Sequence, residues 1–486
     1  MLYRLLPVSH VLGGMLMLFS LAYLMPIASA LIYADGTLLD FVDAMLFSLA
    51  GGFILWFGTR RHKRELKPRD GFLLVTLTWL LMAVIATLPL LLLIDGLTFT
   101  HAFFETMSGL TTTGATVLSG LEHLPPTLNL WRHELNWLGG MGIIVLAVAI
   151  LPLLGVGGMQ LYKAEATGVM KDAKLTARIA DTAKALWLVY FGITLVCILS
   201  LRLVGMNWLD AICHAFAALS LGGFSTYDAS VGHFGSPAIE AVLIFFMLVA
   251  GINFATHFTA WHSRSWRTYW RDTEAKAFLA LIFSSILVCA LYLLAHGTYP
   301  DFPLALRHVA FNLVSIATDS GFASQDYDRW PMFVPLWMLF LSCISVSSGS
   351  TGGGIKMIRT LILARQGLIE LARLVHPRLI APLKIGATEI PPQIASAVLG
   401  FIFLYILAVG ELTFFLVASG LDFTSSITAI VACINNAGPG LNVVGPAQNY
   451  GGLTDFQLWV CTFAMLLGRL EVLSVFVLFT PAFWRR

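Results

Sequence analysis

The apolar segments of this 486-residue chain come in two lengths, and this constrains its fold more than any other feature. Ten segments are long enough to cross the hydrocarbon core of a bilayer, which takes about 20 residues. Four others contain only about 10 to 14 apolar residues, too few to cross, and lie at 101–111, 208–219, 303–317 and 423–434. Hydrophobic residues make up 58% of the chain and charged residues 12%, against about 45–50% and 25% in soluble domains. The pattern predicts an all-α polytopic membrane protein.

The order of long and short segments predicts a four-fold repeat. Spans are expected at 8–32, 41–59, 71–95, 131–158, 182–206, 238–262, 276–296, 332–360, 392–419 and 455–482. After the first two spans, each short segment stands between two long ones. The expected units are two extra N-terminal helices (1–69), then repeats 1 (70–181), 2 (182–275), 3 (276–390) and 4 (391–486).

The basic residues predict the orientation of these spans. Most Lys and Arg residues fall in five groups, at 60–69, 163–184, 264–276, 356–384 and 485–486. The positive-inside rule assigns such segments to the cytoplasm. All five groups, and both termini, lie on that side only if the short segments enter the membrane and return without crossing it.

A polar triplet or quartet ending in glycine follows each short segment, at intervals of about 100 residues. The four loops are Thr111, Thr112, Thr113, Gly114; Ser220, Leu221, Gly222, Gly223; Thr318, Asp319, Ser320, Gly321; and Asn435, Asn436, Ala437, Gly438. Non-helical backbone at membrane depth is tolerated only where it lines a cavity or is buried in protein. Four equivalent strips around one axis predict a selectivity filter of backbone carbonyls that replace the hydration shell of a cation. The alternative is that these glycines only allow close packing of spans.

Two carboxylates accompany these loops. Asp319 lies inside the third loop and Glu105 lies in the first short segment. We expect both side chains to brace the loops, with direct tuning of ion affinity as the alternative.

A glycine-rich run interrupts the second span of repeat 3. It is predicted to be a gate below the filter, with a passive kink as the alternative, and it comprises Gly349, Ser350, Thr351, Gly352, Gly353, Gly354 and Lys356. Consecutive glycines do not hold a straight helix at low cost. Arg469 lies within the last apolar segment, where a charge is costly unless paired. Its expected partners are Glu471, Glu411 or carbonyls of the glycine-rich run, and a plain helix-pairing salt bridge is the alternative to a gating role.

Motifs for other chemistry are missing from the sequence. There is no CxxC or HExxH pattern, and no strand followed by GxGxxG and a helix. The sequence therefore predicts neither an enzyme nor a nucleotide site in this chain.

The four span, short-helix, loop and span units resemble the Trk/Ktr/HKT superfamily of potassium transporters. The two extra N-terminal spans, the 348–356 loop and the run from Gly468 to Glu471 look like its bacterial TrkH branch. The resemblance implies a homodimer in the inner membrane with a cytoplasmic, ring-forming, nucleotide-binding TrkA-type partner. It also implies that the glycine-rich run is the intramembrane gating loop, with Arg469 against it, and that a glycine at all four filter positions goes with potassium preference. Leu221 and Pro439 depart from the other copies and predict an asymmetric ring.

The function expected from these features is potassium uptake across the cytoplasmic membrane through a gated, channel-like pore, with K⁺ bound at the four loops. A potassium symporter coupled to protons or sodium is the first alternative. A weakly selective K⁺/Na⁺ conductance is the second.

Overall fold

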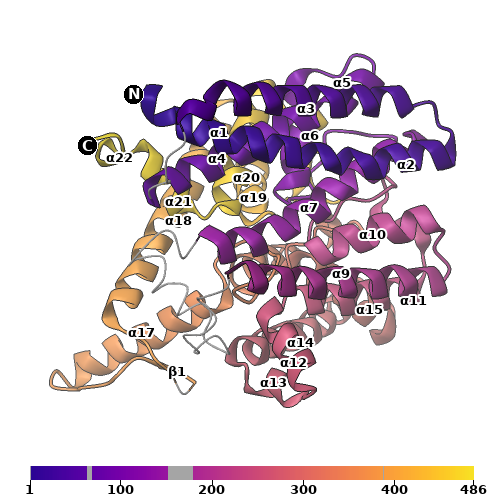
Figure 1. Cartoon of the computed structure of the whole chain (residues 1–486). Helices are drawn as coiled ribbons and strands as arrows, with labels where there is room; N and C mark the ends of the chain where they lie inside the picture. The colour runs from indigo at the N-terminus through magenta and orange to yellow at the C-terminus, as the bar shows by residue number, and fades with distance from the viewer. Residues whose placement is uncertain (1, 63–67, 151–178, 387, 486) are drawn as a thin grey trace.

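The computed structural model describes residues 2–62, 68–150, 179–386 and 388–485, which are mostly helical (Figure 1). In this part of the chain the only strands are β1 (Lys384–Ile385) and β2 (Thr388–Glu389), an antiparallel pair. Six described helices are long and apolar enough to cross a membrane, or eight if each of two bent pairs is one span. The predicted all-α, multi-pass membrane fold is confirmed.

The two N-terminal spans form a tightly packed antiparallel pair. They comprise α1 (Leu2–Phe19), a 3-10 turn, α2 (Leu24–Tyr33) and α3 (Leu38–Thr59). Gly13 and Gly52 lie where α1 and α3 touch, and a Cβ on Gly13 would lie 2.7 Å from the Gly52 carbonyl oxygen. Small residues of this kind let the backbones of two membrane helices approach closely.

The rest of the described chain consists of four repeats, each with a short helix between longer ones. Repeat 1 contains α4 (Pro68–Ala86), α5 (Leu88–Leu93), α6 (Phe99–Leu110) and α7 (Pro126–Ile150). Repeat 2 contains α9 (Ile179–Leu203), α10 (Trp208–Ser220), α11 (Pro237–Ala250), α12 (Phe254–Ser263) and α13 (Arg267–Arg271). Repeat 3 contains α14 (Thr273–Ala295), α15 (Phe302–Ala317), α16 (Phe333–Ile344) and α17 (Met357–Val375). Repeat 4 contains α18 (Pro392–Ala418), α19 (Phe423–Asn435), α20 (Asp455–Arg469), α21 (Val472–Phe479) and α22 (Pro481–Trp484).

The four short helices α6, α10, α15 and α19 lie where the sequence predicts them, and each starts in the same way. A side-chain oxygen just before the first turn accepts a backbone N–H three residues on, at 2.8 to 3.3 Å. The four capping residues are Thr98, Asn207, Asp301 and Asp422. Such caps satisfy N–H groups that a helix leaves unpaired at its start.

Three of the expected spans are not continuous helices. The sequence predicts the break in the 332–360 span from its glycine-rich run, and it misses the breaks in the other two. The span expected at 238–262 bends by 93° between α11 and α12, and that at 455–482 bends by 113° between α20 and α21. The span expected at 332–360 is helical only to Ile344 and resumes at Met357. At the breaks after α11 and α16, backbone groups bond to distant parts of the chain, and at the break after α20 the Arg469 side chain does so, as described below.

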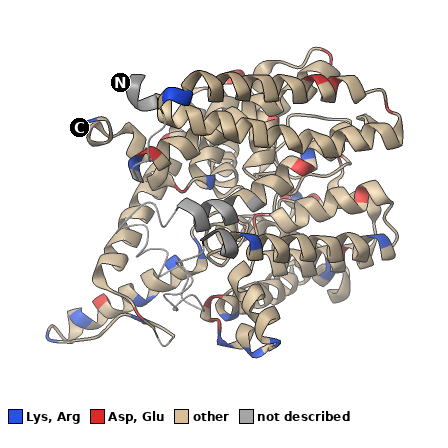
Figure 2. Cartoon of the chain, viewed as in Figure 1, with Lys and Arg blue, Asp and Glu red and all other residues tan. Residues whose placement is uncertain are grey.

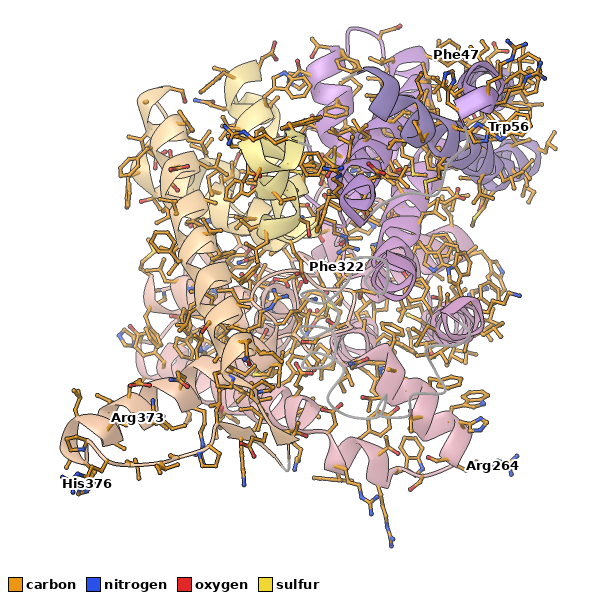
Figure 3. All side chains as sticks on the ribbon, turned by 60° about the vertical axis from the view of Figure 1, so that its left-hand side comes forward. Phe47, Trp56, Arg264, Phe322, Arg373 and His376 are labelled. Atoms are coloured by element: carbon orange, nitrogen blue, oxygen red, sulfur yellow. The ribbon has the colours of Figure 1, made fainter. Side chains whose placement is uncertain are left out.

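Charge is distributed unevenly over the fold. Figure 2 shows most Lys and Arg residues toward the side on which both termini lie. The far end of α17, with Arg373 and His376, projects from the helix bundle on that side (Figure 3). The predicted basic group at 163–184 lies outside the described residues except for its last six.

Candidate functional site

The four polar-glycine loops have one backbone conformation. In each, the residue two before the final glycine is left-handed, with φ of 54° at Thr112, 56° at Leu221, 64° at Asp319 and 59° at Asn436. The next N–H then donates to the carbonyl five residues back, at 2.8 Å in all four copies. This is the Schellman ending of a helix, which satisfies its last carbonyls. The loops are equivalent in backbone geometry even where their side chains differ.

The final glycines lie edge to edge and close a ring in chain order. A Cβ on Gly114 would collide with the carbonyl oxygen of Gly222, and one on Gly223 would collide with that of Ser320. A Cβ on Gly321 would lie 2.6 Å from the carbonyl oxygen of Ala437.

The ring closes between the last repeat and the first. A Cβ on Gly438 would lie 2.7 Å from the carbonyl oxygen of Thr113. All four glycines also have positive φ, between 63° and 84°, which L side chains rarely adopt. Glycine is therefore required at each position for two reasons. The backbone has a positive φ, and a Cβ atom would collide with the backbone of a neighbouring repeat.

A side chain of each short helix holds the segment that leaves the ring. Glu105, His214 and Asn312 all lie nine residues before the final glycine of their repeat. Glu105 accepts from Thr116 at 3.0 Å, His214 pairs with Ser225 at 3.0 Å, and Asn312 bonds to Ser324 at 3.0 Å. In repeat 4 the hydroxyl of Thr428 accepts the N–H of Leu441 at 3.0 Å.

Sequence reasoning identified only Glu105 among these braces. It missed His214, Asn312 and Thr428. An alignment of the four loops on their final glycines would have indicated the first two, because a polar residue lies nine positions before the glycine in three repeats. The fourth brace is shifted by one residue, which hides it from such an alignment.

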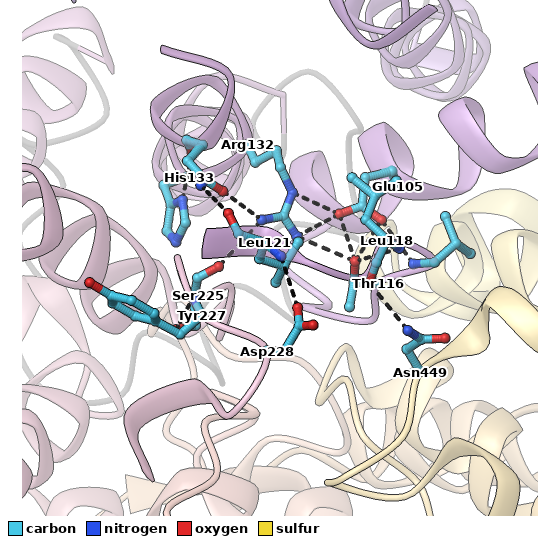
Figure 4. Close-up of polar contacts among 12 residues, drawn as sticks. Glu105, Thr116, Leu118, Leu121, Arg132, His133, Ser225, Tyr227, Asp228 and Asn449 are labelled. Atoms are coloured by element: carbon cyan, nitrogen blue, oxygen red, sulfur yellow. Dashed lines mark hydrogen bonds and ion pairs between the residues drawn. The ribbon is translucent and has the colours of Figure 1, made fainter. Parts of the chain in front are cut away.

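The brace of repeat 1 is a buried ion pair that also reaches repeat 2 (Figure 4). Arg132 on α7 donates to Glu105 at 2.7 and 2.9 Å, and both side chains are 1% exposed. The same guanidinium lies 4.4 Å from the ring centre of Phe224 and donates to the Ser225 carbonyl. Removing one partner of such a pair leaves an uncompensated buried charge. This pair therefore fixes the first two loops against each other.

The predicted glycine-rich run forms a non-helical segment from Ser345 to Lys356, here called the intramembrane loop. It lies against the C-terminal ends of three short helices. Ser345 donates to the Ala317 carbonyl, and Thr351 donates to the Leu219 carbonyl at 3.0 Å. A Cβ on Gly353 would collide with the carbonyl oxygen of Asn435. The intramembrane loop thus lies directly beside the filter-like ring.

Three buried charged groups hold the intramembrane loop. The carboxylate of Asp319 accepts the Gly353 N–H at 3.1 Å, so it braces this loop rather than its own. The Lys356 ammonium donates to the Gly352 carbonyl at 2.6 Å.

Arg469 ends α20 and donates to the carbonyls of Thr351 at 2.9 Å and Gly139 at 2.8 Å. Of the partners considered for it, carbonyls of the glycine-rich run are the ones found. Glu471 instead pairs with Arg359 at 2.9 Å. The guanidinium therefore ties the intramembrane loop to α7, and the break after α20 follows from placing this side chain there.

Comparison with known proteins identifies relatives of this chain. The family model for TrkH cation transport proteins matches residues 38–486. The chain is 45% identical to the Trk system potassium uptake protein TrkH of Escherichia coli K12, covering 98% of this chain and 99% of that one. It is 38% identical to TrkG of the same organism, covering 98% of each.

A solved structure agrees with this match. The crystal structure of the potassium transporter TrkH from Vibrio parahaemolyticus superposes with a TM-score of 0.91 at 42% identity, covering 99% of this chain and 100% of that one. The chain therefore belongs to the TrkH family of cation transport proteins.

Proposed function

We propose that this protein takes up potassium through a gated, channel-like pore, and that the ring of four loops is its selectivity filter. The closed ring of glycines and carbonyls carries the proposal, because it places one backbone oxygen of each repeat against the final glycine of a neighbouring repeat. Backbone carbonyls replace the water around an alkali cation without adding a fixed charge. The curated relatives are named potassium uptake proteins.

The proposed ion-binding residues are the four loops named above, with all four final glycines present. The division into two extra helices and repeats starting at 70, 182, 276 and 391 belongs to the same proposal. The short helices end at the ring, where the partial negative charge of a helix C-terminus favours a cation nearby. The chain itself would then need no enzyme chemistry and no nucleotide.

The intramembrane loop is proposed as the gate. Its three hydrogen-bonded charged groups, Asp319, Lys356 and Arg469, give it defined attachments that opening would have to break. Deleting Gly352–Gly354 is expected to raise basal potassium flux, because the segment beside the filter is shortened. Unchanged or lower flux would indicate a structural kink instead.

We place the protein in the bacterial inner membrane with both termini in the cytoplasm, because the basic residues gather on the side of the termini. Uptake would be driven by the membrane potential, at about 2.3 kcal/mol per charge and 100 mV. A homodimer, regulated by a TrkA-type nucleotide-binding ring at the cytoplasmic side, is proposed from the family resemblance.

Potassium and sodium uptake into liposomes at a set voltage tests this function. We expect potassium to enter faster than sodium and in proportion to the voltage. Equal rates for the two ions would support the weakly selective conductance instead.

A potassium symporter is the second candidate, because secondary transporters place broken helices at mid-membrane and two helix pairs here are sharply bent. Single-channel recording separates the two mechanisms. Unitary current steps support the pore, and potassium flux that requires a sodium or proton gradient supports the symporter.

A further inference from the structure

A basic corner that contains three tryptophans follows α11. α11 (Pro237–Ala250) is too short to cross a bilayer by itself, and α12 leaves it at 93°. We call residues 254–271, which comprise α12 and α13, the elbow. In Figure 1 the two helices of the elbow lie at the lower edge of the molecule. The elbow includes Arg264, Arg267 and Arg271 of the basic group at 264–276, which the positive-inside rule assigns to the cytoplasmic side.

Three tryptophans of the elbow are highly exposed. Trp261 is 82% exposed, Trp266 81% and Trp270 76%. Three indoles facing water would leave much apolar surface hydrated. At a membrane interface the same rings are favoured, because they have an apolar body and one polar N–H.

Cations are interleaved with these tryptophans. Arg264, Arg267 and Arg271 are exposed, and among the described residues none of them forms an ion pair. Figure 3 labels Arg264 at the outer tip of the elbow. Basic and aromatic residues together on an exposed segment fit anionic lipid headgroups, because the cations attract the headgroups and the indoles favour the interface.

The inner side of the elbow is fixed to the protein. His257 bonds to the Tyr269 hydroxyl at 2.8 Å and to the Val249 carbonyl at 2.9 Å. Thr256 donates to Asp272 at 2.7 Å. These bonds hold the two short helices to each other and to the end of α11. A displacement of the elbow would therefore also displace the residues next to it.

The elbow is bonded to the intramembrane loop through its first residue and through the residues that flank it. At its start, Ser347 donates its N–H to the Gly251 carbonyl at 3.0 Å, and the Phe254 N–H donates to the Gly349 carbonyl at 3.1 Å. At its end, Glu274 accepts the N–H groups of Ser348 at 3.0 Å and Ile358 at 2.9 Å. The flanks of the loop thus depend on the position of the elbow.

We propose that the elbow is a binding site for anionic lipid headgroups of the cytoplasmic leaflet, and that bound lipid stabilises the intramembrane loop in the position described here. The second half rests on the proposed function of the loop as a gate. The first half stands on the elbow alone.

Tryptophan quenching tests the binding site with the full chain in liposomes. Brominated phosphatidylglycerol is compared with brominated phosphatidylcholine, and the elbow contribution is the quenching lost in a Trp261→Phe, Trp266→Phe, Trp270→Phe variant. We expect at least about threefold stronger elbow quenching by the anionic lipid, from the attraction of the arginines. The preference should vanish in Arg264→Gln, Arg267→Gln, Arg271→Gln, and persist in the matched control Arg365→Gln, Arg373→Gln, Arg378→Gln.

Equal quenching by both lipids would overturn the anionic site. No elbow quenching by either lipid would place the elbow outside the membrane interface, and a protein partner would then be its occupant.

Potassium flux in the same liposomes tests the link to the loop. We expect phosphatidylglycerol to lower basal flux at least about threefold, and the elbow arginine variant to lose this dependence. Lipid-independent flux alongside intact quenching preference would overturn the link. Absence of potassium flux in every lipid would contradict the proposed function, while the quenching result would still decide the lipid site.

Discussion

The filter-like ring and the intramembrane loop beside it are built on opposite principles. The ring is made four times over, from one backbone conformation that tolerates Thr, Leu, Asp or Asn at its left-handed position. The intramembrane loop exists once, and it is held by its own Lys356 and by charged side chains of two other segments. Under the proposed function, repetition would supply equal ligands around an axis, and a single copy would supply a part that can move without disturbing the ring.

The largest expected effect comes from placing a side chain in the ring. Gly438→Ser puts a Cβ beside the Thr113 carbonyl, so potassium preference over sodium should fall at least about tenfold, equivalent to about 1.4 kcal/mol. Permeability ratios from bi-ionic currents measure this, and Gly114→Ser should behave alike because the copies are equivalent.

Gly120→Ser is the matched control for this prediction. Gly120 also has positive φ, at 70°, but its nearest neighbour is a His123 ring carbon at 3.9 Å. If Gly120→Ser lowered the permeability ratio as much as Gly438→Ser, backbone strain alone would explain the loss and the ring would not be the filter.

The next largest effect is expected at Arg469. Arg469→Gln removes the charge that bonds to the Thr351 and Gly139 carbonyls, and hydrogen bonds to charged groups contribute about 1.5–3 kcal/mol each. Basal potassium flux should rise about tenfold or more, measured in liposomes. Arg373→Gln, on the exposed part of α17, should leave flux unchanged. Lower flux in Arg469→Gln would contradict a closing role.

A smaller effect is expected at Asp319, the one residue shared by both regions. Asp319→Ala removes the acceptor of the Gly353 N–H. The lost hydrogen bond contributes about 1 kcal/mol to the stability of the attached loop, so basal flux should rise a few-fold. Asp319→Asn keeps an acceptor oxygen and should change flux less. If both variants changed ion selectivity and left flux alone, Asp319 would belong to the filter rather than to the loop.

The smallest effect is expected at a neutral brace of the ring. Thr428→Val removes the acceptor of the Leu441 N–H and should lower stability by about 1 kcal/mol. The midpoint of thermal unfolding in detergent measures this, with Thr424→Val, which holds no part of the ring, as the control. An unchanged midpoint would mean that water replaces the brace.

Much of the fold follows from local signals in the sequence. The short helices were predicted to within a few residues, because an apolar run of fixed length is bounded by a capping side chain and by glycine. The equivalence of the loops was also visible, since a final glycine follows each short segment at intervals of about 100 residues.

What could not be predicted depends on contacts distant in sequence. The break after α11 is stabilised by bonds from Gly251 and Phe254 to the intramembrane loop, about 100 residues away. Arg469 had several possible partners, and only the folded arrangement brings the Gly139 carbonyl to it. Ring closure between Gly438 and Thr113 likewise joins the two ends of the repeat array.

The most direct test of the filter is to locate the ion. Anomalous diffraction from crystals grown with rubidium in place of potassium should show a peak bonded to the carbonyl oxygens of the ring, those of Thr113, Gly222, Ser320 and Ala437. No peak between these four oxygens, or a peak bound only by the Asp319 carboxylate, would contradict the account.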